Sequence, residues 1–182
     1  MVALPDVVVT RIDLSARIDE ALAVQALAFG LTPEEVEVRR HIVHRHLLQP
    51  GARALGALTA DDRLVGFVYG MPNSRTHWWS TVVEPYLRRT DSDTWLDDSF
   101  VITELHVLPV FQGHGIGRSL ITTLTDGAEE PRSILSAIDR ESPARRLYRD
   151  LGYQDLARRV HFPSAASPYA VMGAPLPLPR AR

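Results

Sequence analysis

The feature of this sequence that most constrains its fold is a glycine-rich turn, VFQGHGIGRSL, at residues 110–120. Three glycines fall within five residues of it: Gly113, Gly115 and Gly117. Glycine loses more backbone freedom on folding than any other residue, so such a cluster is costly to order. The preceding apolar segment, residues 100–108, predicts a strand, and the apolar spacing over residues 116–128 predicts a helix. The unpaired N–H groups at the start of such a helix attract phosphate.

Two common phosphate-binding loops do not match this turn. A Walker A loop needs a lysine after its last glycine, and the chain contains no lysine. A dinucleotide-binding loop, GxGxxG, needs a third glycine where this chain has Arg118 or Leu120. The turn therefore predicts another phosphate ligand, or else a tight turn that only joins the strand to the helix.

Two segments around the turn resemble a known family. Residues 112–118, QGHGIGR, resemble the Q/R-x-x-G-x-G/A signature of the GNAT superfamily of acetyl-CoA-dependent N-acetyltransferases. TELHVLP, at residues 103–109, is similar to that family's fourth strand, and SPARRLYRDLGYQ, at residues 142–154, is similar to its next block, A..LY...GF. The resemblance covers about residues 100–156 and implies a single-domain α/β (α+β) fold. Its central sheet would be mixed and mostly antiparallel, of about six to seven strands, with helices on both faces.

The resemblance also implies acetyl-CoA as co-substrate. We expect no metal, because the chain has no cysteine and its histidines lack carboxylates at ligand spacing. The pyrophosphate would bind the backbone N–H groups of the turn, and the pantetheine arm would pair with the preceding strand like an added strand. The implied cofactor-binding residues are Leu105, His106, Val107, Gln112, Gly113, His114, Gly115, Ile116, Gly117, Arg118 and Ser142. Ser142 stands where many relatives carry asparagine, so its contact with the cofactor arm is open.

Tyr148 and Glu104 are the candidate catalytic residues. Tyr148 occupies the tyrosine of the LY pair, which in many relatives donates a proton to the leaving sulfur of coenzyme A; the alternative is a core tyrosine. Glu104 and His106 alternate along the expected strand and should share one face. Burial there would raise the pKa of Glu104 towards the range of a general base. His106 is the weaker candidate for the base, and a purely structural glutamate is the alternative.

The segment 71–99 is too long for a structureless loop and predicts a short helix near residues 81–89. Thr81 and Glu84 have the spacing of a capping box. The segment holds the candidate substrate-binding residues Trp78, Trp79 and Trp95, with five acidic side chains near them. Aromatic rings beside carboxylates suit a cationic amine. The alternative is that the tryptophans pack on the sheet and the acids form a solvated face.

The remaining pattern predicts further strands and helices on either side of the motifs. The expected strands are 7–12, 52–59, 64–69, 133–138, 153–156 and 169–174, and the expected helices are 15–29, 33–48 and 143–151. In the last helix we expect Ala144, Leu147, Tyr148 and Leu151 to face the core. Residues 1–174 would form the domain, and the proline-rich tail 175–182 would be loose.

Composition excludes several classes of function. A net charge of −2 with no basic stripe makes nucleic acid an improbable partner, and no apolar run is long enough to cross a membrane. The absence of cysteine and of a signal peptide fits the cytoplasm. His41, His44 and His46 lack a set of carboxylates at ligand spacing, so we read them as a solvated helix face.

The expected function is therefore acetyl transfer to the amine of a small molecule. A peptide amine, or a non-catalytic domain that binds or senses acyl-CoA, are the alternatives, and a third is a phosphate-ligand binder without acyl transfer. The acyl chain and the state of association, with a homodimer among the options, stay open.

Overall fold

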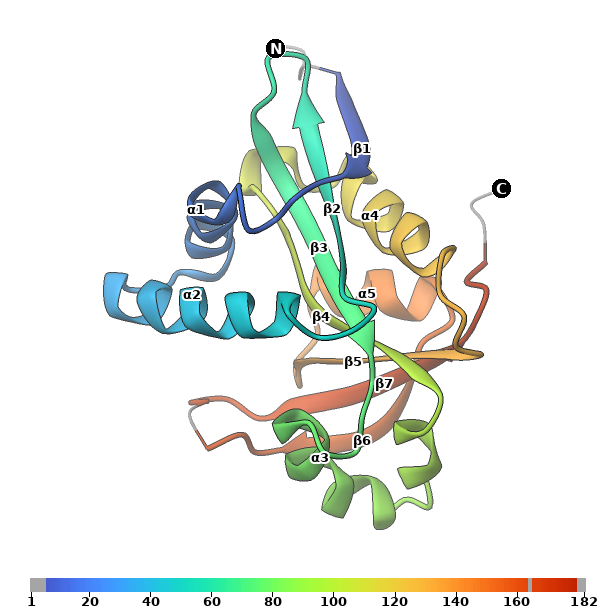
Figure 1. The fold of residues 1–182 in the computed structure, drawn as a ribbon. Coiled ribbons are helices and arrows are strands. Elements are labelled where there is room, and N and C mark those ends of the chain that lie inside the picture. Colours follow the sequence, from blue (N-terminus) through green and yellow to red (C-terminus); the bar gives the residue numbers. More distant parts are fainter. Residues whose placement is uncertain (1–5, 164, 180–182) are drawn as a thin grey trace. The chain divides into compact units, whose positions relative to one another are not determined.

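The structure is a computed structural model that describes residues 6–163 and 165–179 (Figure 1). Seven strands form one sheet in the order β1-β2-β3-β4-β5-β7-β6. The strands are β1 Val7–Arg11, β2 Arg53–Thr59, β3 Leu64–Pro72, β4 Ser99–Val107, β5 Arg132–Ile138, β6 Gln154–Val160 and β7 Tyr169–Pro175. The helices are α1 Ile18–Phe29, α2 Pro33–Leu47, α3 Trp78–Arg88, α4 Ile116–Thr125 and α5 Pro143–Asp150, with 3-10 turns η1 Asp93–Leu96 and η2 Pro109–Phe111.

The strand pairing confirms the expected mixed and mostly antiparallel sheet. β1 with β2, β2 with β3, β5 with β7 and β6 with β7 are antiparallel, whereas β4 with β5 is parallel. The parallel ladder joins Ser99–Ile102 of β4 to residues 132–135 of β5. β4 continues to Val107 after the last residue of that ladder.

The chain divides into two compact units, and β4 contributes to both. Unit 1 comprises Met1–Met71 and Thr103–Leu124, and unit 2 comprises Pro72–Ile102 and Thr125–Arg182. Each unit has its own buried apolar side chains and its own part of the sheet.

In unit 1, helices cover both faces of β3. Phe67 and Tyr69 share one face of the strand and belong to a core cluster with residues of α1 and α2, such as Leu22 and Val43. Gly66 points to the other face, where a Cβ would lie 3.4 Å from Leu120 of α4. The alternation of β3 therefore places α1 and α2 on one face and α4 on the other.

Thr32 and Glu35 have the sequence spacing of a capping box, and the structure forms one at the start of α2. Thr32 accepts a hydrogen bond from the backbone N–H of Glu35, and the Glu35 carboxylate accepts one from the N–H of Thr32. Pro33 occupies the first turn, where its missing N–H costs nothing. Local residues alone thus fix where this helix begins.

In unit 2, side chains also cover both faces of β5. The indole N–H of Trp79, in α3, donates to the hydroxyl of Ser136 at 3.2 Å. Ser133 lies on the opposite face of the strand, and its hydroxyl is 2.7 Å from that of Tyr153, which stacks edge-on against Tyr148 of α5. α3 and α5 therefore pack on opposite faces of this part of the sheet.

Three local expectations were wrong. α3 begins at Trp78, and the hydroxyl of Thr81 donates to the Trp78 carbonyl inside the helix instead of capping it. In α5, Ala144 is exposed and Arg145 takes the buried place. In the tail, Leu178 is buried, so this part is packed rather than loose; residues 180–182 of the expected tail lie outside the described residues.

Candidate functional site

The glycine turn lies between η2 and α4, as the sequence predicts, and residues 112–115 are exposed. Gly113 and Gly115 both have φ of 78°, a left-handed conformation that other residues adopt only with strain. A Cβ on either glycine would meet no atom of the described residues within 4 Å. Glycine is thus required there by the backbone conformation, and open space lies over the turn.

One side chain ties the turn to β4, and a second closes a hydrogen bond within the turn. Gln112 Nε2 donates to the Val107 carbonyl at 2.9 Å, and His114 Nδ1 lies 2.7 Å from the Gln112 carbonyl oxygen. A carbonyl only accepts, so Nδ1 of His114 carries the hydrogen. The strand end, the turn and the start of α4 therefore form one connected unit.

These features fit the pyrophosphate of acetyl-CoA. The start of α4 presents backbone N–H groups and the positive end of the helix dipole, and the left-handed glycines leave the main chain accessible. Ile116, Gly117 and Arg118 form the first turn of α4 and are half-buried. The turn and helix start therefore offer backbone donors and an open approach of the kind that a diphosphate uses.

In β4, Glu104 and His106 lie on one face, as the sequence predicts. His106 Nε2 is 2.7 Å from Glu104 Oε2, and the NH1 of Arg39, in α2, donates to Glu104 Oε1 at 3.1 Å. Leu105 alternates to the opposite face, and the backbone of residues 105–107 continues to the turn. Arg39, 65 residues away in the sequence, is a member of this group that the sequence pattern does not predict.

The expected rise in the pKa of Glu104 was wrong. Burial does raise the pKa of this carboxyl group, but the hydrogen bond from His106 and the charges of His106, Arg39 and His46 lower it by more. The net pKa lies below the ordinary value of a glutamate. Glu104 is therefore an ionised carboxylate with both oxygens engaged, which makes it a weak base.

In unit 2, α5 carries Ser142 and Tyr148. Ser142 caps the helix by accepting the N–H of Arg145 at 3.2 Å. Tyr148 is buried, and its ring centroid lies 5.8 Å from that of Tyr153. The predicted helix, which starts at Pro143 and buries one face, places Ser142 at its N-terminus and Tyr148 on the buried face.

Sequence reasoning missed Arg145, which is fully buried one turn before Tyr148. Its NH1 lies 3.1 Å from Asp139, and its NH2 lies 2.7 Å from each oxygen of Asp155. Asp139 follows β5 and Asp155 lies in β6, so the arginine joins α5 to two strands. A signal in the sequence was that acids, Asp139 and Asp155, flank a helix whose inward face includes position 145.

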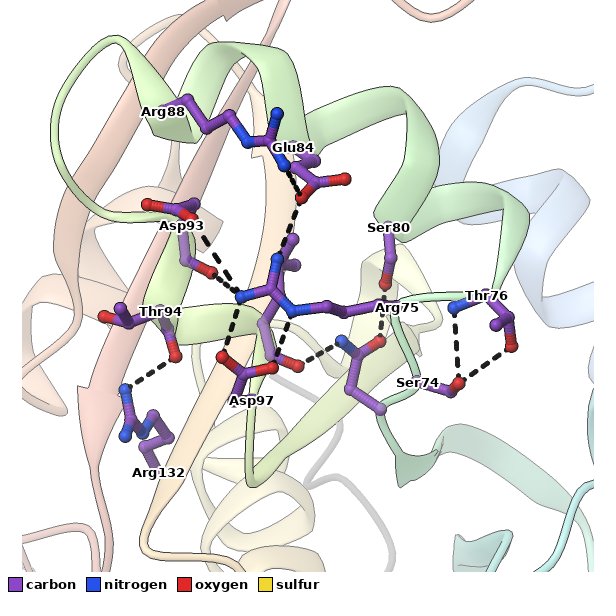
Figure 2. A network of polar contacts seen from close by, with 12 residues as sticks. Ser74, Arg75, Thr76, Ser80, Glu84, Arg88, Asp93, Thr94, Asp97 and Arg132 are labelled. Carbon is purple, nitrogen blue, oxygen red and sulfur yellow. Dashed lines mark hydrogen bonds and ion pairs between the residues drawn. The ribbon is translucent and has the colours of Figure 1, made fainter.

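One arginine holds two of the five acids of the segment between β3 and β4 (Figure 2). Arg75 forms two hydrogen bonds with Asp97, at 2.6 and 2.7 Å, and one with Glu84, at 2.9 Å. It also donates to the backbone carbonyl of Asp93 at 3.1 Å. Asp97 and Glu84 therefore already have a cationic partner, which weakens the argument that they attract a cationic acceptor.

The three tryptophans of this segment have different surroundings. Trp78 is 58% exposed and stacks on Phe162, at 6.0 Å between ring centroids. Trp79 bonds to β5, as described above, and is half-buried. Trp95 lies against Gly173, where a Cβ would be 2.7 Å from its ring, and against the guanidinium of Arg132. Trp78 is thus the one with most of its ring available to a ligand.

Two further classes of site find no support in the part of the chain that is described. No group of three or more histidine, cysteine, aspartate or glutamate side chains is placed to hold a metal ion. His46 Nδ1 instead lies 3.2 Å from the hydroxyl of Tyr69. Between residues 6 and 179, with residue 164 left aside, no helix is long and apolar enough to span a membrane.

Comparison with known proteins places this fold and turn among acetyltransferases. A GCN5-like protein acetyltransferase of Mycobacterium tuberculosis is 34% identical over 123 residues, which cover 63% of this chain and 60% of that protein. The chain thus matches less than two thirds of that relative's length.

Solved structures show the same fold at low sequence identity. The ribosomal-protein-S18-alanine N-acetyltransferase of Escherichia coli matches with a TM-score of 0.65 and 15% identity, over 94% of each chain. The PaiA N-acetyltransferase of Thermoplasma acidophilum, in complex with coenzyme A, matches with a TM-score of 0.60 and 14% identity, over 93% of this chain and 99% of that one. A sequence model of the acetyltransferase (GNAT) domain matches residues 53–155, more than half of the chain. The chain belongs to the GNAT family of acetyltransferases, whose co-substrate is acetyl-CoA.

Proposed function

We propose that this protein transfers the acetyl group of acetyl-CoA to the amine of a small molecule. The observation that supports it most is the exposed turn with two left-handed glycines at the start of α4, in a chain of the GNAT family. When bound, acetyl-CoA supplies the acetyl thioester that the amine attacks. The turn would bind its diphosphate through backbone N–H groups, with His114 and Arg118 adding positive charge.

The chain must also manage two protons. A primary amine with a pKa near 10.4 is neutral in only about one molecule in 2,500 at pH 7, which costs roughly 4.6 kcal/mol. Removal of the amine proton falls to the β4 pair of Glu104 and His106. We assign the second proton, which the departing thiolate takes up, to the hydroxyl of Tyr148. Ser142 would bond to the cofactor arm at the start of the same helix.

The exposed ring of Trp78, stacked on Phe162, suits an acceptor with an apolar or aromatic part. Trp79, the next residue of α3, and Trp95, which packs against Gly173, are the other candidate contacts of the acceptor. A peptide or protein amine is the second candidate acceptor, because the relative from Mycobacterium tuberculosis is named a protein acetyltransferase.

The test begins with binding and then measures turnover. Acetyl-CoA should raise the melting temperature, since a ligand that binds the folded state stabilises it. Release of free coenzyme A thiol should then be followed with a panel of small amines and a panel of lysine and N-terminal peptides. Release of coenzyme A with the small amines supports the proposal. Release with the peptides alone would show that the acceptor is a peptide amine and not a small molecule. Binding without release in either panel would favour an acyl-CoA sensor.

Replacing Tyr148 by phenylalanine tests the second proton. We expect turnover to fall by about 10- to 100-fold with little change in the KM for acetyl-CoA, as for loss of a proton donor. Tyr153→Phe is the matched control, because it removes a buried hydroxyl from the partner ring whose bond goes to Ser133. Unchanged turnover in the Tyr148→Phe variant would exclude it as the acid.

A further inference from the structure

We propose that His106 is the residue that removes the amine proton, and that Glu104 and Arg39 position it. This inference rests on the proposed N-acetyltransferase function and names the base within it. Glu104 then acts through the histidine instead of touching the substrate.

The hydrogen bonds fix the tautomer of His106. A carboxylate only accepts hydrogen bonds, so Nε2 of His106, 2.7 Å from Glu104 Oε2, must carry a hydrogen. In the neutral ring, the lone pair is then on Nδ1. The pair thus presents a histidine with one nitrogen held by a carboxylate and the other able to accept a proton.

Arg39 holds the second oxygen of Glu104 and completes the group. Its NH1 donates to Oε1 at 3.1 Å from α2, a separate element of unit 1. The carboxylate is therefore shared between a cation and the imidazole, with a side-chain exposure of only 15%. A carboxylate bonded on both oxygens has no free site at which to take up a proton from the amine.

Proton affinities favour the imidazole over the carboxylate. Transfer from an amine with a pKa of about 10.4 to an ordinary imidazole, of pKa about 6.5, is unfavourable by about four powers of ten. Transfer to a glutamate, of pKa about 4.3, is unfavourable by about six. The low pKa of Glu104 in this structure widens that difference.

The surroundings of the ring suit a base that a substrate can approach. Phe29 of α1 meets it edge-on at 5.8 Å, and Phe67 of β3 lies at 5.6 Å. His106 itself is 8% exposed, whereas its neighbour Phe29 is 44% exposed, so the imidazole lies next to a side chain at the surface. The other titratable groups around the pair are Arg39 and His46, from α2, and Tyr69, from β3.

The proton balance is complete with these residues. The amine nitrogen forms a bond to the acetyl carbon as the carbon–sulfur bond breaks. The amine proton passes to Nδ1 of His106, directly or through a water, and the Tyr148 hydroxyl gives its proton to the sulfur. Solvent then takes the proton from His106 and returns one to Tyr148.

The experiment compares kcat, and the pH dependence of kcat/KM, among the wild-type full chain, three variants and one control variant. His106→Gln keeps a donor for Glu104 but has no basic nitrogen, so kcat should fall by 100-fold or more. Glu104→Gln should lower kcat by about tenfold and move the acid limb to lower pH, since a negative charge beside the imidazole is lost. Arg39→Met should move that limb to higher pH, because a positive charge is lost.

Arg40→Met is the control for Arg39, because Arg40 lies on the same helix and pairs with Asp19 and Glu37 instead. It should leave the profile unchanged. If Glu104→Gln is more damaging than His106→Gln, or if His106→Gln keeps its acid limb, the proposal is wrong and Glu104 is the base.

A second measurement separates this proposal from the proposed function. If the wild-type protein acetylates no amine, the function fails, but the tautomer of His106 can still be observed by ¹⁵N NMR of the histidine rings. We expect Nε2 to carry the hydrogen of the neutral ring, because it faces the Glu104 carboxylate. A neutral ring with its hydrogen on Nδ1 overturns the arrangement.

Discussion

Replacing Arg145 by methionine tests how α5, the helix of Tyr148, is held. The guanidinium is fully buried and pairs with Asp139 at 3.1 Å and with Asp155 at 2.7 Å. Methionine has a similar length and fills much of the same space without a charge. The variant therefore removes two ion pairs while it keeps most of the packing.

The structure sets the size of the expected loss. Removing one partner of a buried ion pair costs about 3–5 kcal/mol in unfolding free energy, because the other charge is left without a counterion. Here Asp139 keeps Arg158, at 2.6 Å, and the backbone N–H of Arg159, at 2.9 Å. Asp155 is 27% exposed and can be hydrated. Nε of Arg145 is buried without an acceptor among the described residues, and methionine removes that cost. We therefore expect Arg145→Met to lower the free energy of unfolding by about 3 kcal/mol, at the lower end of the range.

For a chain of 182 residues this corresponds to a fall of about 6–12 °C in Tm. Urea unfolding at pH 7 would give the free energy, and a scanning calorimeter the Tm. Arg149→Met is the control: it lies on the same helix but is exposed, and pairs with Glu141 at 2.8 Å. It should change Tm by less than about 2 °C. A similar fall in both variants, or a fall below about 3 °C in Arg145→Met with an unchanged m value, would refute the reasoning.

Two further predictions concern the turn and the acid range. Gly115→Ala places a Cβ on a residue in the left-handed conformation, which costs about 1–2 kcal/mol. The Kd for acetyl-CoA, measured by calorimetry, should therefore rise about tenfold. An unchanged Kd would show that this backbone conformation is not needed for binding. Burial raises the pKa of Asp139, but bonds from Arg158 and the Arg159 N–H and the charge of Arg145 lower it by more, to a net value below the ordinary one. A carboxyl group whose pKa is lower in the folded state than in the unfolded state stabilises the protein at pH values above the unfolded pKa, near 3.9. That stabilisation is lost as the pH falls through the folded pKa. We therefore expect the urea midpoint to fall less steeply with decreasing pH, below about pH 5, in Asp139→Asn than in the wild type. Equal slopes in the two proteins, measured between pH 3 and 7, would contradict this expectation.

Local signals predicted much of this fold, and the contrast between two similar motifs shows where they stop. Thr32 and Glu35 form the capping box that their spacing predicts. Thr81 and Glu84 have the same spacing, yet Thr81 bonds to the Trp78 carbonyl and Glu84 is held by Arg75 and Arg88. A spacing rule counts only the residues of one segment, and it cannot include a distant arginine that competes for the glutamate.

The glycine turn was predictable for a related reason. Its conformation is set by the residues within it, since Gly113 and Gly115 need no neighbour to require a positive φ. The identity of the ligand was not contained in those glycines, because spacing excluded two loop types without choosing a third. The flanking segments supplied that choice, and the family match over residues 53–155 supports it.

Two expectations about acidic side chains, a raised pKa for Glu104 and attraction of a cationic acceptor by the acids near the tryptophans, did not take account of arginine partners. A carboxylate in an apolar strand face should have a raised pKa, and acids near tryptophans should attract a cation; both arguments assume that no cation is already present. Arg39 reaches Glu104 from 65 residues away in the sequence, and Arg75 reaches Asp97 from 22. Periodicity places each acid on the right face but does not include partners at such separations. The partner then decides the chemistry: with Arg39 and His106 on its two oxygens, Glu104 stays ionised, and the role of base passes to the histidine that it holds.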